Sequence, residues 1–124
     1  MRDRTEADDI VQGATNRALL DLILPPMRRA AKAKGYAIAV HGSLNRDIDL
    51  VAIPWIDAAK DADTLLTSLC GAIAGVTGNC NKEAAWTPKP HGRVARLCTV
   101  YCGENHTQLD VSVMPTLDAP KSDA

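Results

Sequence analysis

The chain has 124 residues, enough for one hydrophobic core but not for two independent ones, so we expect a single domain. Its 14 basic and 15 acidic residues nearly balance, and no overall charge draws the protein toward nucleic acid or an anionic membrane. With two tryptophans, two tyrosines and no phenylalanine, the sequence has few side chains on which successive bases could stack. Extended nucleic-acid binding is therefore not expected.

Two features of the sequence indicate where the protein resides. No apolar run approaches the roughly 18 residues of a membrane span, and the charged start "MRDRTEADD" lacks the apolar segment of a signal peptide. We therefore expect a cytoplasmic protein without membrane association. The sequence has four cysteines, Cys70, Cys80, Cys98 and Cys102. They form no CxxC pair, and only three histidines could supplement them as zinc ligands, so we do not expect a structural zinc site. We interpret them as reduced thiols that mostly pack in the core.

The first half of the chain predicts a helix followed by two strands. We expect residues 1–14 to be disordered and the domain, residues 15–115, to begin with a helix capped by Thr15. Pro25 and Pro26 are expected to kink or split this helix. Its apolar residues recur at helical spacing, at Leu19, Leu20, Ile23, Leu24, Met27 and Ala31. Strands are predicted at 36–41 and 47–53, and the second is apolar on both faces below its aspartates, which is typical of a strand covered on both sides.

The second half predicts another helix and a hairpin. The segment 57–75 has an apolar stripe and is expected to end at Gly75. Residues 76–93 are predicted to form a long loop, a feature that is often functional in a compact domain. Strands at 94–102 and 107–114 are joined by a turn at 103–106. Residues 116–124 are expected to be a disordered tail. The fold class is thus α/β (α+β), with a small mixed sheet of about four strands and two or three helices.

Three aspartates form the strongest chemical signal. Asp47 and Asp49 are two residues apart on a predicted strand, so they point to the same face, about 6–7 Å apart. Asp110 lies on a later strand, and the three carboxylates converge if that strand pairs beside the first. Carboxylates that close repel one another unless a proton, a basic neighbour or a divalent cation intervenes, and Mg²⁺ selects such oxygen ligands.

The motifs "HGSLNRDIDL" and "LDVSV" resemble the nucleotidyltransferase superfamily of the DNA polymerase β type. The text of residues 36–114 looks most like small uncharacterised nucleotidyltransferase-like proteins encoded by tailed phages and prophages. The resemblance implies that Gly42 and Ser43 contact a nucleoside triphosphate. It implies further that Asp47, Asp49 and Asp110 are the catalytic acidic residues, holding Mg²⁺ or possibly Mn²⁺, and that Asp110 helps to activate an acceptor hydroxyl. The sequence does not identify the acceptor, for which a partner protein is one candidate.

The spacing of these motifs departs from the superfamily pattern. Only residues 44–46 separate the Gly-Ser turn from the acidic pair, where most members have a helix of several residues whose N-terminus supports a phosphate. Arg46, with Lys89 or Arg93 of the "PKPHGR" segment, is a candidate phosphate ligand in its place. His41 we interpret as a structural residue. The alternatives are a non-catalytic nucleotide- or protein-binding module on the same fold, and a metal-dependent phosphohydrolase or nuclease on an unrelated scaffold.

Overall fold

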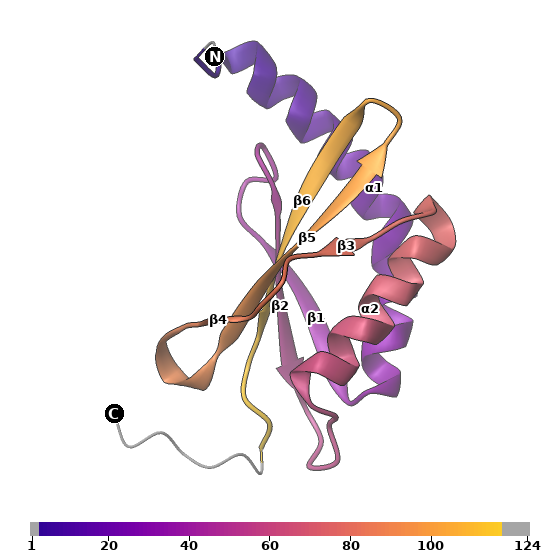
Figure 1. Cartoon of the computed structure of the whole chain (residues 1–124), viewed down its shortest axis with the longest axis vertical. Coiled ribbons are helices and arrows are strands. Elements are labelled where there is room, and N and C mark those ends of the chain that lie inside the picture. The colour runs from indigo at the N-terminus through magenta and orange to yellow at the C-terminus, as the bar shows by residue number, and fades with distance from the viewer. Residues whose placement is uncertain (1–2, 118–124) are drawn as a thin grey trace.

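The computed structural model describes residues 3–117, which form two α-helices and one mixed sheet of six strands (Figure 1). The helices are α1 (Glu6–Ala33) and α2 (Ala62–Thr77). The strands are β1 (Tyr36–His41), β2 (Ile48–Pro54), β3 (Asn81–Lys82), β4 (Thr87–Pro88), β5 (Val94–Cys102) and β6 (Asn105–Val113). A short 3₁₀ turn, η1 (Pro90–Gly92), precedes β5. The α/β class predicted from the sequence is confirmed, whereas about four strands was too few.

The sheet has the strand order β1-β2-β6-β5-β3, and β4 also pairs with β5. β2 and β6 run parallel, and every other pair is antiparallel. The two additional strands come from residues 76–93, where the sequence predicted a loop. Each has two residues and pairs along β5, with Asn81 opposite Thr99 and Thr87 opposite Ala95. Such short pairings leave no periodic pattern in the sequence, which is why they were missed.

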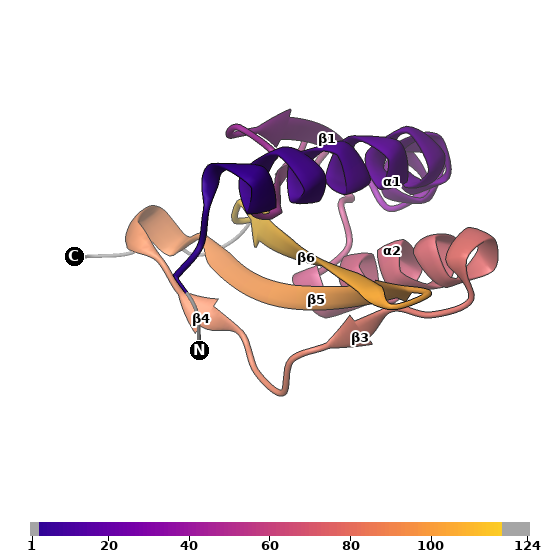
Figure 2. The ribbon, with the colours of Figure 1, turned by 90° about the horizontal axis from the view of Figure 1, so that it is seen from above.

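One face of the sheet packs against both helices, and the two helices contact each other (Figure 1). Alternate residues of β2 and β6 join helix residues in one buried core, since side chains alternate between the two faces of a strand. β2 is not covered on both sides as predicted: its burial alternates, and Ile53 on the opposite face is 44% exposed. No helix of the described chain covers that opposite face. Figure 2 shows the β3–β4 segment along the β5 edge of the sheet.

Helix α1 begins earlier than the sequence predicted. Residues 6–14, which we expected to precede the ordered domain, form its first turns. Thr5 caps the helix, because its side chain accepts a hydrogen bond from the Asp8 N–H while the Asp8 carboxylate accepts one from the Thr5 N–H. The pattern "TEADD" therefore contained the true start signal. The expected tail beyond residue 117 lies outside the described residues.

Pro25 and Pro26 do not split α1, which continues to Ala33. Two consecutive prolines remove the hydrogen bonds to the carbonyl groups of Asp21 and Leu22, and both of those residues are exposed, so water can satisfy the carbonyls. On both sides of the prolines, α1 packs into the core, since Ile23 and Met27 are 0% exposed. Tertiary packing therefore overrides the local signal.

Helix α2 extends two residues past Gly75, where the sequence predicted its end. Asp61 caps its start by accepting a hydrogen bond from the Thr64 N–H at 2.7 Å. Gly78 follows its end with φ +94°, the left-handed conformation that glycine adopts without strain. Within the described part of the chain, neither helix is both long and apolar enough to cross a membrane.

Candidate functional site

Three neighbouring strands place His41, Asp49 and Asp110 side by side on the face of the sheet that no helix of the described chain covers. We call this face the open face. His41 of β1 is the register partner of Asp49 of β2, and Asp49 is in turn the partner of Asp110 of β6. Adjacent strands are about 4.8 Å apart, and register partners point to the same face, so the three side chains form a row. Asp47, just before β2, also acts electrostatically on Asp49. We call Asp47, Asp49 and Asp110 the acidic site.

The charges of the acidic site oppose the ionisation of its central member. The pKa of the Asp49 carboxyl is raised above its usual value, first by burial and then by the negative charges of Asp47 and Asp110. His41 acts in the opposite direction and lowers it. All three aspartates are half-buried, so the site is open to solvent. A bound cation would relieve this repulsion.

The turn after β1 is built around the Asp49 carboxylate. Gly42 has φ +81°, and a Cβ atom at this position would lie 2.6 Å from Asp49 Oδ2. A side chain at residue 42 would therefore be strained and would displace the carboxylate. The "GS" motif forms a tight turn, and its glycine also leaves room for the Asp49 carboxylate.

Side chains of α1, and of Arg4 just before it, donate hydrogen bonds to backbone carbonyl groups of the turn. Arg4 donates to Asn45, Asn16 to Leu44 and Arg17 to Ser43, at 3.2, 2.7 and 3.1 Å. Asn16 is fully buried and also accepts a hydrogen bond from Thr107 of β6 at 2.9 Å, so the turn is tied to two elements. Residues 42–47, all described, contain no helix, which agrees with the short spacing seen in the sequence.

Ser43 and Arg46 both have partners within the chain. The Ser43 hydroxyl accepts a hydrogen bond from the Asn45 N–H at 3.2 Å, which removes one N–H from those available to an anion. Arg46 is turned toward α1, with its Nε atom 3.7 Å from Asp9 Oδ1. Arg4 contacts the same Asp9 carboxylate.

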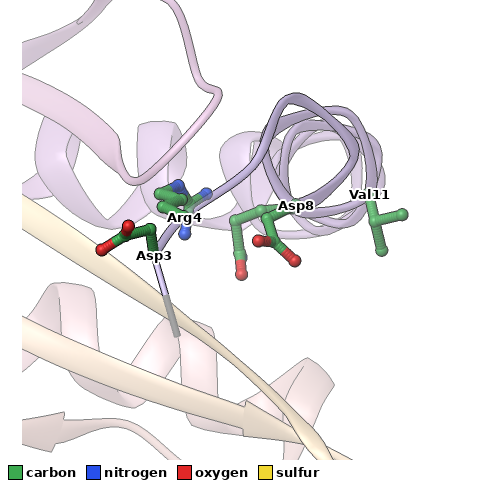
Figure 3. Close-up of a pocket in the computed structure, with 5 residues that line it drawn as sticks. Asp3, Arg4, Asp8 and Val11 are labelled. Carbon is green, nitrogen blue, oxygen red and sulfur yellow. The ribbon is translucent and has the colours of Figure 1, made fainter. Parts of the chain in front are cut away.

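A pocket of about 330 Å³ lies beside this part of α1. Figure 3 shows Asp3 and Arg4 before the helix and Asp8 and Val11 on it. Two carboxylates and one guanidinium group line this pocket.

Lys89 lines a pocket that Asp110 also lines, whereas Arg93 is not among the lining residues. This pocket of about 170 Å³ is lined by residues of three segments, the chain before β5, β5 itself and β6. Arg93 precedes Val94, whose register partner is Val113, whereas Asp110 pairs with Leu97. The Lys89 N–H donates a hydrogen bond to the Arg93 carbonyl at 2.8 Å, so the two backbones are neighbours just before β5. Of the two candidates in the "PKPHGR" segment, Lys89 is the one that lines this pocket.

Three cysteines approach one another more closely than the acidic side chains do. The Sγ atoms of Cys70, Cys80 and Cys98 lie within 4.8 Å of one another. In the described chain this is the one group of three or more His, Cys, Asp or Glu side chains that meets this spacing. We call it the cysteine cluster. Its members come from α2, from the segment before β3 and from β5, so no local motif could have predicted it.

The remaining cysteine and two of the aromatic residues also have defined places. Cys102 is exposed at the end of β5, so it is not one of the cysteines that pack in the core. Trp55 is 56% exposed. Trp86 donates a hydrogen bond to Asp63 at 2.6 Å, and the Arg96 guanidinium lies 5.6 Å from its ring centroid. Trp86 thus fastens its segment to α2 and β5.

Comparison with models of protein families gives no match to this chain, and comparison with curated proteins gives none either. The nucleotidyltransferase resemblance therefore depends on its own motifs and on where they lie in the fold.

Proposed function

We propose that this protein is a metal-dependent nucleotidyltransferase that transfers a nucleotidyl group from a nucleoside triphosphate to an acceptor hydroxyl. The observation that supports this best is the parallel pairing of β2 with β6, which sets Asp49 beside Asp110 although 60 other residues separate them in sequence. The Gly42 turn backs onto the same carboxylate. Turn, acidic pair and third acid thus gather at one place on the open face.

The acidic site fits Mg²⁺ or Mn²⁺ by the chemistry of its donors. Carboxylate oxygens are the ligands that hard divalent cations prefer, and the pKa of Asp49 is raised by burial and then by the negative charges of Asp47 and Asp110. Asp47, Asp49 and Asp110 would hold the metal. When bound, it would neutralise charge on the triphosphate and help align the reacting groups.

The chain's own residues would bind the substrate and take up a proton. The Lys89 ammonium, on the pocket that Asp110 also lines, would bind a phosphate oxygen. The acceptor oxygen would bond to the α-phosphorus as pyrophosphate leaves, and Asp110 would receive the proton of the acceptor hydroxyl. Because the pocket holds about 170 Å³, it is large enough for phosphate groups but not for a whole nucleotide. The base and the acceptor would extend along the open face.

A non-catalytic nucleotide- or protein-binding module is the second candidate. It is favoured by the turn itself, because residues 42–47 form no helix and α1 side chains hold their carbonyl groups. No helix N-terminus then faces the phosphates, and the site loses a source of anion binding. This module would bind nucleotide without transferring it.

Labelled nucleotides distinguish the two candidates. Wild type and Asp49→Asn are incubated with Mn²⁺ or Mg²⁺, a cell extract that supplies acceptors, and nucleoside triphosphates labelled at the α or the γ phosphate. Nucleotidyl transfer predicts that the α label, but not the γ label, enters a product, and that the Asp49→Asn protein does not support it.

Calorimetry with the same nucleotides measures binding without requiring turnover. Binding with no label transfer would favour the module. Transfer of the γ label, or α-label transfer that persists in Asp49→Asn, would contradict the proposed reaction.

A further inference from the structure

The cysteine cluster joins three parts of the fold at one point. Cys70 is on α2, Cys98 is on β5, and Cys80 lies two residues before Lys82, which is the register partner of Cys98. The Sγ atoms of Cys70 and Cys98 are 4.0 Å apart. Cys98 is buried, and the other two are half-buried. The thiols thus converge beneath α2, away from the open face.

The spacing of the thiols suits a single metal ion. Zn²⁺ bonds thiolate sulfur at about 2.3 Å, so two sulfurs of a tetrahedral site are about 3.8 Å apart. The Cys70–Cys98 separation of 4.0 Å is within a few tenths of this value. Ordinary packing of small apolar side chains does not require three sulfurs to face one another. Three soft donors with no carboxylate among them favour Zn²⁺ over Mg²⁺.

The charges around the cluster also suit thiolates. The Cys80 and Cys98 thiols donate hydrogen bonds to Cys70 and lower the pKa of its thiol, with smaller contributions from the charges of Lys82 and Arg96. Hydrogen bonding to Cys70 and Cys80, followed by burial, raises the pKa of Cys98. These contacts favour a thiolate at Cys70. Three thiolates around Zn²⁺ would carry one net negative charge, which Lys82 and Arg96 would offset.

We propose that Cys70, Cys80 and Cys98 form a zinc site that fastens the β3 segment and β5 to α2. Binding replaces the remaining thiol protons, which pass to solvent. Within the described residues, the group contains no fourth Cys, His, Asp or Glu ligand, so the fourth position is left for water or a small exogenous ligand. The site is separate from the acidic site, which is made of oxygen donors on the other face of the sheet.

Cobalt spectroscopy of the reduced protein tests the site directly. Adding Co²⁺ should produce a thiolate-to-cobalt charge-transfer band that saturates at one ion per chain, and Zn²⁺ should abolish it by displacement. Cys80→Ser should lose most of the band, because it removes a ligand at a position that is only half-buried. Cys102→Ser, which removes the exposed cysteine outside the cluster, and Asp49→Asn should both keep it.

Alkylation provides a second measurement that needs no variant. With Zn²⁺ bound, mass spectrometry should show Cys70, Cys80 and Cys98 protected from iodoacetamide, while Cys102 reacts as before. The zinc site is refuted if wild type shows no charge-transfer band, if Cys102→Ser loses the band as Cys80→Ser does, or if zinc leaves alkylation unchanged. Oxidation to a Cys70–Cys98 disulfide that excess zinc does not prevent would also contradict it.

Discussion

The acidic site and the cysteine cluster are both sets of three possible metal ligands, yet they differ in burial, donor and spacing. The acidic site lies half-exposed on the open face, and its carboxylates keep apart. The cysteine cluster lies beneath α2, with its sulfurs within 4.8 Å of one another. Uncompensated carboxylates repel, whereas thiols are neutral when protonated and can share one charge through hydrogen bonds. Without a bound cation, thiol ligands can therefore lie close together, whereas carboxylate ligands stay farther apart.

The difference leads to opposite expectations for the metal-free protein. In the acidic site, where the carboxylates repel one another, neutralising one of them should stabilise the fold. In the cysteine cluster, where the thiols pack together, replacing one of them should destabilise it. The following experiments test this contrast, from the largest expected effect to the smallest.

The largest effect is expected from Mn²⁺ acting on the acidic site. A cation that binds only the folded state stabilises it by about 2.7 kcal/mol at a hundredfold excess over its dissociation constant. Wild type should therefore melt at a higher temperature in Mn²⁺ or Mg²⁺. Asp49→Asn should lose that gain while its metal-free form is as stable as wild type or more so.

The control for this prediction is the cysteine cluster. Cys80→Ser should keep the response to Mg²⁺, an ion that thiolates bind poorly. A wild type indifferent to millimolar Mg²⁺ and Mn²⁺, with and without nucleotide, would leave the acidic site as a set of strand-end carboxylates.

Lys89→Ala should weaken nucleotide binding by about tenfold or more, because a charge-assisted hydrogen bond contributes about 1.5–3 kcal/mol. Calorimetry with a nucleoside triphosphate and Mg²⁺ measures the loss. Lys82→Ala, which removes a lysine beside the cysteine cluster, is the matched control and should bind normally. Arg93→Ala, which removes a neighbouring residue that does not line the pocket, should lose less affinity than Lys89→Ala. The reverse order would make Arg93 the phosphate ligand.

The sequence predicted the acidic site better than it predicted the fold around it. The spacing of Asp47 and Asp49 predicted a shared strand face; the structure begins β2 at Ile48, with Asp47 just before it. Asp110 was recognisable as a polar residue within an apolar strand. Its pairing with Asp49 remained conditional, because strand order depends on contacts between distant segments. His41, interpreted as structural, lies in the same row, and its position directly before the Gly-Ser turn was the available signal.

Other features could not be predicted because tertiary contacts decide them. α1 passes through Pro25 and Pro26 because the core holds Ile23 and Met27 on either side. The cysteine cluster combines a helix, a connecting segment and a strand, which no fixed spacing describes.

Cys98→Ser should destabilise the metal-free protein by about 1–3 kcal/mol, because a hydroxyl replaces a thiol at a site that is 1% exposed. Chemical denaturation without metal measures the change. Cys102→Ser is the matched control and should stay within about 0.5 kcal/mol of wild type, since its site is exposed. Equal effects of the two substitutions would show that the cluster does not contribute to packing.

Gly42→Ala tests whether the turn shapes the acidic site. Forcing a left-handed conformation on alanine costs about 1–2 kcal/mol, and Gly103→Ala, at φ +61° in the β5–β6 turn, should cost the same. The two positions differ in their surroundings, because a Cβ at residue 42 meets Asp49 Oδ2 at 2.6 Å and one at residue 103 meets nothing within 4 Å. Only Gly42→Ala should therefore reduce the Mn²⁺ stabilisation. Equal responses to metal would separate the turn from the site.

The smallest effect is a pH dependence of opposite sign at two aspartates. Burial, Asp47 and Asp110 raise the pKa of Asp49, so the folded state binds this proton more tightly than the unfolded state does. Stability should therefore fall as the pH rises from the usual carboxyl pKa of 3.8 through the raised value, and Asp49→Asn should remove this fall. Hydrogen bonding to the Thr64 N–H lowers the pKa of Asp61, whose contribution is present above 3.8 and lost as the pH falls through the lowered value. Denaturant unfolding without metal should accordingly show wild type losing stability relative to Asp49→Asn with rising pH, and gaining it relative to Asp61→Asn. A difference from Asp49→Asn that stays constant across this range would mean that the acidic site is not repulsive when empty, and the contrast with the cysteine cluster would then fail at its central step.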